Sequence, residues 1–516
     1  MHACTAWGHN KPLVTLAILI AEARKNAVVT ILTNTPMHTK MMKELRNLPA
    51  KRFDAISHRI HIMDVGGRTG LQPYEEVEQV ASSLVLLYKQ SGDVRCLTSG
   101  RTIGGSELPP PSVAIVDPFA TYALQALRSV ASPQDVPILL WFTSTAGLAI
   151  YMGGPKELGG RFDYYKAMLD EEVKVKGRKL EEVVDQLMLP TRGDVVEIPG
   201  YPPVYDYELS PQEVSVAGHG YLVYNTRNAV QQVEGTITVA TSVLEKDAVQ
   251  AIRSHYQALG HEWINIGPLS VIPGVKTASA KDEEIESFLD RMEQQFGGQS
   301  VVYISFGSVW WPPQVETIWA LLDELTDARV PFIMASGSSL AQVPEDVKQR
   351  AQESGNGMVV SWAPQEQILN HTATGWFLTH GGWNSTQEAL IHKVPLIFWP
   401  IIGDQPLNAA LLTLKYKAAF ELLEVRTGER GTKRPYRCGS DDTVPRFAVD
   451  SAKEEFRRMI QSMKGEDGQR VRSNFLQLAE QVAKTWNDGG EAKEQLELFL
   501  KKICRLRKLQ GKGHAL

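Results

Sequence analysis

Short runs of β-branched and other apolar residues alternate with amphipathic stretches along this chain, and this alternation is what most limits the folds available to it. Runs that are separated by helices and read as buried on both faces are typical of a parallel, doubly wound sheet. In the first half the predicted strands are His2–Thr5, Val28–Leu32, Arg59–Val65, Val113–Val116 and Pro137–Phe142. A helix is predicted over Leu13–Ala23, opened by Pro12, because proline is tolerated in the first turn of a helix.

The same alternation starts again after a stretch of different composition. Residues 266–284 contain a glycine- and proline-rich run followed by polar residues, which indicates a linker between domains. Beyond it the predicted strands are Ser300–Phe306, Pro331–Ala335, Met358–Ser361, Gly375–Leu378 and Val394–Trp399. A chain of 516 residues is also too long for one ordinary core. We therefore predict an α/β protein with two Rossmann-like, doubly wound domains that face each other across a cleft.

The predicted domain boundaries follow from this division. The units are an N-terminal domain (1–265), the linker (266–284), a C-terminal domain (285–483) and a final helix with a basic tail that packs back across the domains (484–516). Long interruptions at 66–111 and 153–215 are expected to form lids or walls of a pocket. Residues 425–447 are predicted to be a polar surface insertion.

Composition excludes several classes of protein. The formal net charge of −5 gives no footprint for general nucleic-acid binding. The four cysteines show no CxxC or zinc-site spacing, which argues against a disulfide framework and suits a reducing compartment. No secretory signal is visible, and the longest apolar stretch, Val136–Met152, is too short to span a bilayer. We expect a monomeric cytoplasmic protein.

The common nucleotide and zinc motifs do not occur in the sequence. Residues Gly267–Thr277 end in Gly-Val-Lys-Thr rather than Gly-Lys-Thr, and the run Gly66–Gly70 does not make GxGxxG. An HExxH motif is absent. These observations exclude a P-loop NTPase, a dinucleotide-dependent dehydrogenase and a zinc hydrolase of that type.

The segment 362–405 carries the most chemical information. Phe377–Thr379 is predicted to end a strand and His380–Gly382 to make a tight turn. Asn384 and Ser385 are residues that favour the N-cap position, so they are predicted to open a helix. A turn of this kind binds anions, because the free N–H groups at the helix start and the helix dipole both point outward.

Other side chains of this segment suit the rest of a nucleotide sugar. Glu388 follows one turn into the helix, where a carboxylate can reach ribose hydroxyls. Trp362, at the end of a strand, offers a flat face for a base. Asp404 and Gln405 can form several hydrogen bonds to the hydroxyls of a sugar.

This segment resembles the donor-binding signature of family 1 UDP-glycosyltransferases, the plant-type box WAPQ…HCGWNSxxE…(D/E)Q. The likeness continues at Phe306–Ser308, Ile266–Leu269 and Pro199–Pro203, and in weaker form over nearly the whole chain. It implies the GT-B architecture of two Rossmann-like domains, a UDP-sugar as co-substrate and no metal cofactor. One departure is Gly381, where plant members usually have cysteine.

The resemblance also implies roles for individual residues. For the uracil and ribose it implies Trp362, Ala363, Gln365 and Glu388. For the diphosphate it implies Ser308, His380, Asn384 and Ser385. For the hexose it implies Trp383, Asp404 and Gln405, with a looser match of Thr143 to a residue that touches the donor sugar. A terminal glutamine rather than histidine favours glucose over galactose by analogy with the family.

The catalytic residues are expected in the N-terminal domain. His9 lies in a segment that resembles the family's GHxxP loop, and Asp117 matches the family's aspartate partner. An alcohol is a poor nucleophile, and a histidine with a reference pKa of about 6.5 suits general-base catalysis near neutrality. Asp117 would hold the imidazole tautomer and stabilise its charged form. Only eight residues precede His9, so the sequence leaves open whether the chain is truncated or simply has a short first strand.

The predicted function is inverting transfer of a hexose, by preference glucose, from UDP to a hydroxyl of a small apolar acceptor such as a phenolic, sterol or other lipophilic metabolite. The diphosphate charge would be met by the helix N-terminus and by His380 in place of a metal. A UDP-sugar epimerase or hydrolase and a catalytically silent nucleotide-sugar-binding protein remain as alternatives. A membrane-associated lipid glycosyltransferase would use the basic tail, although a final helix with a solvated basic end is favoured. The basic residues of this tail are Lys501, Lys502, Arg505, Arg507, Lys508 and Lys512.

Overall fold

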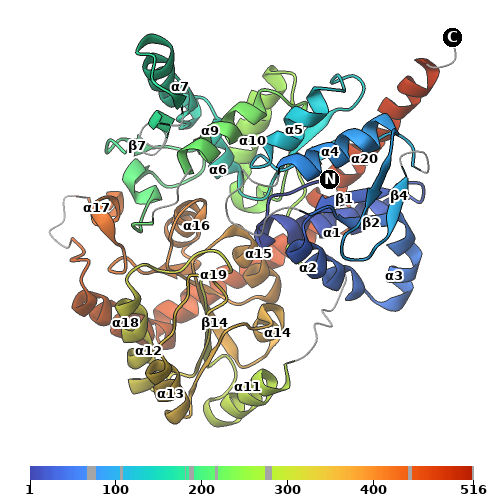
Figure 1. The fold of residues 1–516 in the computed structure, drawn as a ribbon. Coiled ribbons are helices and arrows are strands. Elements are labelled where there is room, and N and C mark those ends of the chain that lie inside the picture. Colours follow the sequence, from blue (N-terminus) through green and yellow to red (C-terminus); the bar gives the residue numbers. More distant parts are fainter. Residues whose placement is uncertain are drawn as a thin grey trace.

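Two parallel β-sheets, each packed against helices, form the two halves of the molecule (Figure 1). The computed structural model describes residues 1–66, 77–104, 108–180, 182–184, 191–214, 219–272, 282–439 and 444–513. Most strands of the two sheets are buried along their whole length, as expected for sheets covered on both faces. This confirms the predicted α/β class with two doubly wound sheets.

The first sheet has the order β2-β1-His2-β5-β6-β9-β10. Its strands are β1 (Val29–Thr33), β2 (Ile60–Asp64), β5 (Ala114–Val116), β6 (Ile138–Phe142), β9 (Gly235–Thr238) and β10 (Glu262–Asn265). His2 pairs in parallel with Leu32 of β1 and with Val116 of β5, so it stands where the first strand of a Rossmann-like sheet belongs. The chain order therefore reverses between His2 and β5, and a reversal of this kind places the loops after both at one crevice.

The second sheet repeats this arrangement with the order β13-β12-β11-β14-β15-β16. Its strands are β11 (Val301–Ser305), β12 (Phe332–Ala335), β13 (Gly357–Val360), β14 (Thr374–Thr379), β15 (Leu396–Phe398) and β16 (Ala419–Glu421). The order reverses between β11 and β14. The loops that hold Ser308 and His380 follow these two strands and lie side by side at the crevice.

The helices connect the parallel strands. In the first half they are α1 (Trp7–Ala23), α2 (Thr35–Arg46), α3 (Ala50–Ile56), α4 (Val77–Lys89), α5 (Thr121–Arg128), α6 (Ala146–Gly153), α7 (Phe162–Asp170), α9 (His219–Val230) and α10 (Ser242–Ala258). In the second they are α11 (Glu283–Phe296), α12 (Val315–Asp327), α13 (Glu345–Glu353), α14 (Gln365–Asn370), α15 (Trp383–His392), α16 (Gln405–Ala410), α17 (Gly428–Gly431), α18 (Val449–Lys464) and α19 (Glu466–Ala483). Helix α20 (Glu491–Gly513) ends the described chain.

Two predictions for the N-terminus are wrong in detail. The first strand is not His2–Thr5, because only His2 makes sheet pairs. The first helix begins at Trp7 rather than at Pro12, so Pro12 lies inside it. Proline has no N–H, and the carbonyl of Gly8 therefore lacks its helical partner. The side chain of Asn384, from the second half of the molecule, donates to this carbonyl at 2.5 Å.

The predicted surface insertion at 425–447 packs against the first half of the molecule. Arg426 lies between the carboxylates of Glu208 and Glu421, at 3.5 and 3.0 Å, and all three side chains are almost fully buried. Gln212 donates to the carbonyl of Val425 at 3.0 Å. Segment 206–214 is thereby fixed to the C-terminal half, directly after the small antiparallel pair β7–β8 (Val195–Val196, Val204–Tyr205). A second small antiparallel pair of the N-terminal half, β3–β4 (Asp93–Arg95, Thr102–Gly104), lies beside β2 and α4.

Helix α20 returns from the second half of the molecule to the first, as Figure 1 shows. Glu491, its first residue, accepts hydrogen bonds from the backbone of Ser242 at 2.9 Å and from the side chain of Asn265 at 2.5 Å. Just before it, the indole of Trp486 donates to the carbonyl of Pro268 in the linker at 2.7 Å. The basic side chains of the tail beyond Ile503, and residues 273–281 of the predicted linker, lie outside the described part.

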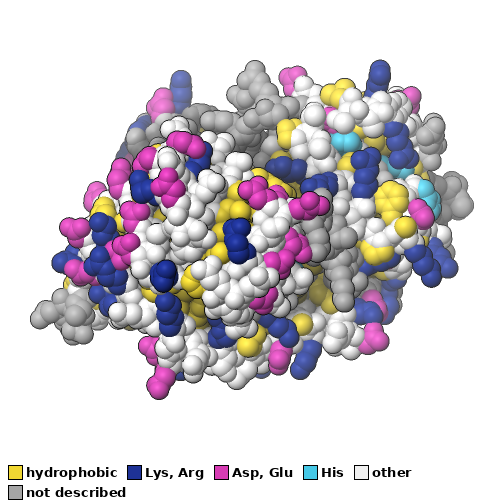
Figure 2. All heavy atoms as spheres, turned by 90° about the horizontal axis from the view of Figure 1, so that it is seen from below, with side chains coloured by type: hydrophobic (Ala, Val, Ile, Leu, Met, Phe, Trp, Pro, Cys, Tyr) yellow, Lys and Arg dark blue, Asp and Glu magenta, His cyan; other side chains and the backbone are white. Residues whose placement is uncertain are grey.

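The surface carries charges of both signs. Figure 2 shows one face, on which Lys and Arg side chains are interspersed with Asp and Glu rather than gathered in a basic patch. Within the described part of the chain, no helix is long and apolar enough to cross a membrane.

Candidate active site

His9 and Asp117 meet at the crevice of the first sheet. His9 lies in the first turn of α1, and Asp117 directly follows β5, so the two residues come from the loops on either side of the reversal. The Nδ1 atom of His9 lies 2.6 Å from Oδ2 of Asp117. Asp117 is fully buried, whereas the His9 side chain is 23% exposed. Nε2, the second ring nitrogen of His9, is therefore not the one that Asp117 engages.

The electrostatic surroundings of His9 favour its protonated form. Burial alone would lower the pKa of the imidazole, but the charge of Asp117 and the hydrogen bond to it outweigh burial, and the pKa lies well above 6.5. The other oxygen of Asp117 accepts a hydrogen bond from the backbone of Phe119 at 2.8 Å. The aspartate is thus held in place on both sides, and it fixes the orientation of the imidazole.

Cys4 is a neighbour of His9 that sequence reasoning missed. Its thiol lies within hydrogen-bonding reach of the imidazole, and one ligand atom each from Cys4, His9 and Asp117 lies within 4.8 Å of the others. The thiol and its hydrogen bond both raise the pKa of His9, as Asp117 does. A lone cysteine in a loop carries no spacing signal, so only its place in the fold shows this contact.

The predicted anion-binding turn, His380–Gly382, directly follows β14. It lies against the loop after β11, and this close approach depends on a glycine in that loop. Gly307, in the loop after β11, has a φ of +79°, and a Cβ atom there would lie 2.9 Å from the imidazole of His380. The two loops therefore touch at the crevice of the second sheet. Burial lowers the pKa of His380 to about 4, so this ring is neutral near pH 7. Its contribution to a bound diphosphate would be an N–H group and not a positive charge.

Helix α15 begins two residues earlier than predicted. Gly382 is its N-cap, and Asn384 and Ser385 lie in the first turn instead of capping it. A small residue suffices at the cap because the carboxylate of Asp404 accepts from the backbone N–H of Trp383 at 3.1 Å. Both polar atoms of the Asn384 amide make hydrogen bonds to residues outside the second half. The NH₂ group donates to the carbonyl of Gly8, and the oxygen accepts from the hydroxyl of Ser270 at 2.6 Å.

The residues predicted for the nucleoside lie together next to this turn. Trp362 is 60% exposed and follows β13. Ala363 is buried beside it. Gln365 donates to Oε2 of Glu388 at 2.5 Å, so the amide fixes the carboxylate that is predicted to bind ribose.

Two lysines of the first half contact these residues, and sequence reasoning missed both. Lys11 of α1 lies 2.7 Å from Oε1 of Glu388 and also contacts Glu366. The ammonium of Lys43, on α2, lies 5.3 Å from the centre of the Trp362 ring. Burial raises the pKa of Glu388, and the charge of Lys11 acts against this rise. Their partners are more than 300 positions away in sequence, so no local pattern could have indicated these pairs.

The residues predicted for the hexose lie where the two halves meet, but their side chains differ in direction. Asp404 accepts from the hydroxyl of Ser144 at 2.9 Å. The side-chain oxygen of Gln405 accepts from the backbone of Ile401 at 2.7 Å, which leaves its NH₂ group for a ligand. The indole of Trp383 is buried and donates to the carbonyl of Val239 at 3.1 Å. Both N–H groups of Trp383 are therefore engaged within the protein, the indole by Val239 and the backbone by Asp404.

The remaining predicted residues frame this region. Ser308 is exposed in the loop after β11, and Thr143 is buried immediately after β6. Ser144, the neighbour of Thr143, makes the contact with Asp404 and was missed. Nearby, Trp311 is buried and packs edge-on against Phe306 in the core of the second half.

Two groups of described residues could each present three ligand atoms to a metal. They are Cys4, His9 and Asp117, and the surface group Asp290, Glu293 and His371. In the first, the 2.6 Å hydrogen bond already joins the imidazole to the carboxylate. In the second, His371 lies 3.3 Å from Asp290 on α11, away from the crevice. The turn predicted to hold the diphosphate offers N–H groups, which need no metal to bind an anion.

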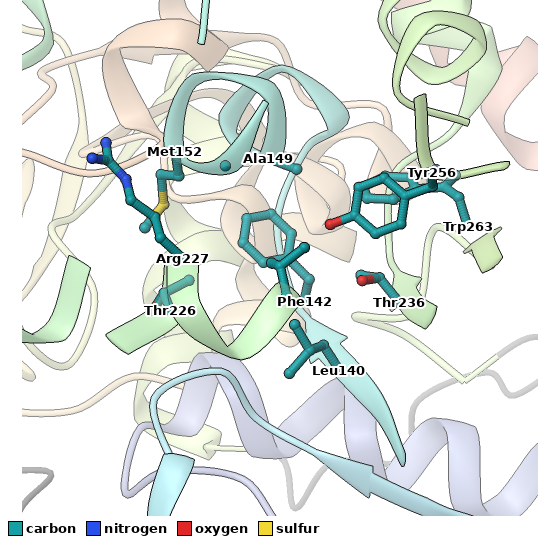
Figure 3. A pocket seen from close by; sticks show the side chains of 11 residues that line it. Leu140, Phe142, Ala149, Met152, Thr226, Arg227, Thr236, Tyr256 and Trp263 are labelled. Atoms are coloured by element: carbon teal, nitrogen blue, oxygen red, sulfur yellow. The ribbon is translucent and has the colours of Figure 1, made fainter. Parts of the chain in front are cut away.

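A small cavity lies inside the first half, between β6, β9 and β10 on one side and α6, α9 and α10 on the other (Figure 3). Its walls are mainly apolar, with Phe142, Tyr256 and Trp263 among them. The volume of about 10 Å³ is roughly what one water molecule needs. This cavity is therefore not the pocket for a sugar or an acceptor.

Comparison with known proteins agrees with this geometry. Residues 220–429 match the family model described as UDP-glucoronosyl and UDP-glucosyl transferase. The chain is 31% identical over 506 residues to the UDP-glycosyltransferase eriJ of Hericium erinaceus, covering 94% of this chain and 95% of that protein. It is 26% identical to UDP-glycosyltransferase 72B1 of Arabidopsis thaliana, covering 98% and 96% of the two chains.

Solved structures show the same architecture. UGT2 of Phytolacca americana, complexed with UDP-2fluoro-glucose and pterostilbene, superposes with a TM-score of 0.66 at 20% identity and covers 98% of this chain and 99% of that one. UGT71G1 of Medicago truncatula, complexed with UDP-glucose, gives a TM-score of 0.64 at 21% identity and covers 97% of both chains.

Two Rossmann-like sheets whose crevices are opposed define the GT-B class of glycosyltransferases. Given its likeness to eriJ over almost its whole length, the chain belongs to the family of UDP-glucuronosyl and UDP-glucosyl transferases. It is a UDP-glycosyltransferase, which confirms the resemblance seen in the sequence.

Proposed function

We propose that this enzyme transfers glucose from UDP-glucose to a hydroxyl of a small apolar acceptor, with inversion at the anomeric carbon. The observation that carries the proposal is the 2.6 Å pair of His9 and Asp117 at the crevice of the first sheet, opposite the turn after β14 of the second. In this proposal, residues 1–265 provide the general base and bind the acceptor, and residues 285–483 bind the UDP-sugar.

The catalytic step follows from the position of the two nitrogens of His9. Nδ1 is engaged by Asp117, so Nε2 takes the proton of the acceptor hydroxyl. The acceptor oxygen then forms a bond to the anomeric carbon while the bond from that carbon to the diphosphate breaks. UDP leaves with the electron pair, and Asp117 stabilises the imidazolium that results.

The groups that we propose to bind the diphosphate are uncharged hydrogen-bond donors. The first-turn N–H groups of α15, the neutral ring of His380 and the hydroxyls of Ser308 and Ser385 would bind the leaving UDP. None of these groups needs a metal as an intermediary, so we propose metal-independent transfer.

The proposed acceptor class rests on chemistry of the relatives and on charge. The solved Phytolacca americana enzyme is complexed with pterostilbene as well as with UDP-2fluoro-glucose. This chain has a net charge of −5 and no basic patch on the face seen in Figure 2, which does not suit a polyanionic acceptor. Phenolic, sterol and other lipophilic alcohols are therefore the proposed acceptors, in a cytoplasmic setting.

The test is sugar transfer by the parent and by two variants. UDP-glucose is offered with a panel of phenols, sterols and hydroxy lipids, with and without a chelator, and UDP binding is measured by calorimetry. His9→Ala should lower kcat by about 10²–10⁴-fold and leave UDP affinity unchanged, because it removes the proton acceptor only. A base must be neutral to act, so kcat should rise with pH through the raised pKa of His9. Asp117→Asn should move this rise to lower pH and reduce its plateau.

The same measurements separate the alternatives. Tight UDP binding without transfer to any acceptor would favour the nucleotide-sugar-binding protein. Release of free glucose or conversion to another UDP-hexose without acceptor would favour the hydrolase or the epimerase. Full turnover of His9→Ala would show that the base lies elsewhere.

A further inference from the structure

Lys11 and Lys43 belong to the first half of the molecule, yet both contact side chains of the second half. These side chains, Glu388 and Trp362, are the ones proposed to bind the nucleoside. Lys11 is 2.7 Å from Glu388, and the two side chains are only 11% and 6% exposed. The other oxygen of Glu388 is taken by Gln365. A carboxylate can accept further hydrogen bonds, but this one is almost fully buried under Lys11, so a ribose hydroxyl reaches it only when the ammonium moves away.

Lys43 stands in the same relation to the base. Its ammonium lies 5.3 Å above the ring of Trp362, which is the flat surface proposed for uracil. A cation over an aromatic face and a base stacked on that face exclude each other, because both use the same area of the ring. Lys11 thus occupies the ribose position, while Lys43 lies over one face of the ring proposed for the base, whose indole is otherwise exposed.

Charge on the facing groups makes these contacts favourable. Lys11 lies between the carboxylates of Glu366 and Glu388, and Glu44 of α2 adds a third negative charge nearby. Burial alone would lower the pKa of Lys11, but Glu388 and Glu366 outweigh it and raise the pKa above the usual value, so the ammonium keeps its charge. One oxygen of Glu366 is buried without a hydrogen-bond partner, and it could accept from a ribose hydroxyl once Lys11 has moved.

We propose that Lys11 and Lys43 set the affinity for the pyrimidine nucleoside diphosphate by competing with it for Glu388 and Trp362. The first half must withdraw on this side before the nucleotide binds, and the lysines lower the apparent affinity by the strength of their own contacts. The inference rests on the proposed function, since it needs Glu388 and Trp362 to bind the uridine.

Lys43 offers the cleaner test, because Lys40 is a matched control on the same helix. The ammonium of Lys40 lies 5.8 Å above the ring of Trp7, within its own half of the molecule. Both lysines make one cation–π contact, and both lose one charge on change to methionine. Lys43→Met should lower the Kd for UDP by about 2- to 5-fold, and Lys40→Met should leave it unchanged.

Lys11→Met should lower the Kd for UDP further, on the order of tenfold, because it removes a buried ion pair from the ribose position. Calorimetry is run at pH 8.5, so that Glu388 stays ionised when its lysine is gone, and thermal unfolding verifies the fold. If Lys11→Met does not fold, the comparison of Lys43→Met with Lys40→Met still decides.

An unchanged Kd in Lys43→Met and Lys11→Met would overturn the inference. So would a raised Kd, which would show that the lysines bind the nucleotide directly. Failure of the proposed function looks different: the parent and all the variants would then either bind no UDP, or bind UDP and form no glucoside with any acceptor.

Discussion

Gly381 is the residue at which this chain departs from the plant-type box, and its surroundings explain why a side chain does not fit. Its φ is +83°, a region that side chains disfavour, and a Cβ atom would lie 2.4 Å from the ring of Phe398. The ring of a buried strand residue cannot yield without loss of packing. A cysteine at this position of the present chain would therefore require different packing of Phe398.

Gly381→Cys should lower the free energy of unfolding by about 2–4 kcal/mol, from backbone strain and overpacking together. Gly403→Cys is the matched control, since Gly403 has a φ of +74° but no heavy atom within 4 Å of a built Cβ. It should lose only about 1 kcal/mol, the strain alone. Denaturant unfolding without nucleotide measures both, and equal losses would show that Phe398 does not limit this position.

Single residues also show what the sequence could and could not predict about the site. The pattern around His9 and Asp117 predicted two residues that the fold brings to 2.6 Å, because each follows a strand of the first sheet. Lys11 lies two positions from His9 and was missed. Its role depends on contact with Glu388 in the other half of the molecule, and a local sequence pattern cannot indicate that two residues so far apart in the chain are close in space.

Helix α10 is interrupted near its start by a buried glutamate. Glu245 has non-helical backbone angles (φ −127°, ψ 37°), and the hydroxyl of Tyr416 donates to the carbonyl of Leu244 at 2.7 Å. One oxygen of Glu245 accepts from Tyr201 at 2.6 Å and from the backbone of Gly147 at 2.9 Å, while the other is buried without a partner. Burial raises the pKa of Glu245 to about 7.

This pKa makes the stability of the helix depend on pH. Folded Glu245 keeps its proton up to about pH 7, whereas the unfolded chain loses it near 4.5, the ordinary pKa of a glutamate. The unfolded state binds fewer protons in this window, so stability falls as pH rises through it, by about 3 kcal/mol in all. The free energy of unfolding of Glu245→Gln should therefore rise relative to that of the parent as the pH is raised from 5 to 8.

Unfolding of the parent and of Glu245→Gln at several pH values checks this. Glu480→Gln, at an exposed position of α19, is the control and should track the parent at every pH. A constant difference between Glu245→Gln and the parent would mean that Glu245 does not titrate in this window.

The elements themselves were predictable where they are apolar and long enough to show a period. Strands β6 and β14 lie within a residue of their predicted ends, because their residues are buried on both faces. The short strands β9 and β10 were missed, since four residues of mixed polarity carry little signal. The start of α1 was predicted too late, because proline is common in the first turn of a helix and Pro12 was taken to mark it. In the structure Pro12 lies inside the helix, and the carbonyl of Gly8, which has no helical partner, accepts a hydrogen bond from Asn384. This contact forms only when the two halves of the molecule are assembled.

At the scale of the whole molecule, α20 fastens its own start to the first half. The carboxylate of Glu491 accepts hydrogen bonds from Thr241, Ser242 and Asn265. Glu491→Ala should cost about 2–4 kcal/mol, because it leaves several donors without a charged acceptor. Glu497→Ala is the control on the same helix: its exposed contact with Lys501 spans 3.8 Å and should contribute little.

Hydrogen exchange is the informative measurement for this change, because two-domain proteins need not unfold in one step. Faster exchange at Ser242 and along α20 in Glu491→Ala alone would agree with the role given to the carboxylate. Equal exchange in both variants would show that α20 is held by its apolar contacts instead.

The hydrogen bond between Trp486 and Pro268 joins the two places where the chain passes from one half to the other. Because the linker and the segment before α20 are tied together here, the two halves cannot slide past each other at this point without breaking this hydrogen bond. In the proposed mechanism, each turnover brings the imidazole of His9 and the anomeric carbon of the sugar to the same separation. Two crossings tied together at one place restrict the positions that the halves can take, and so favour the same separation from one turnover to the next.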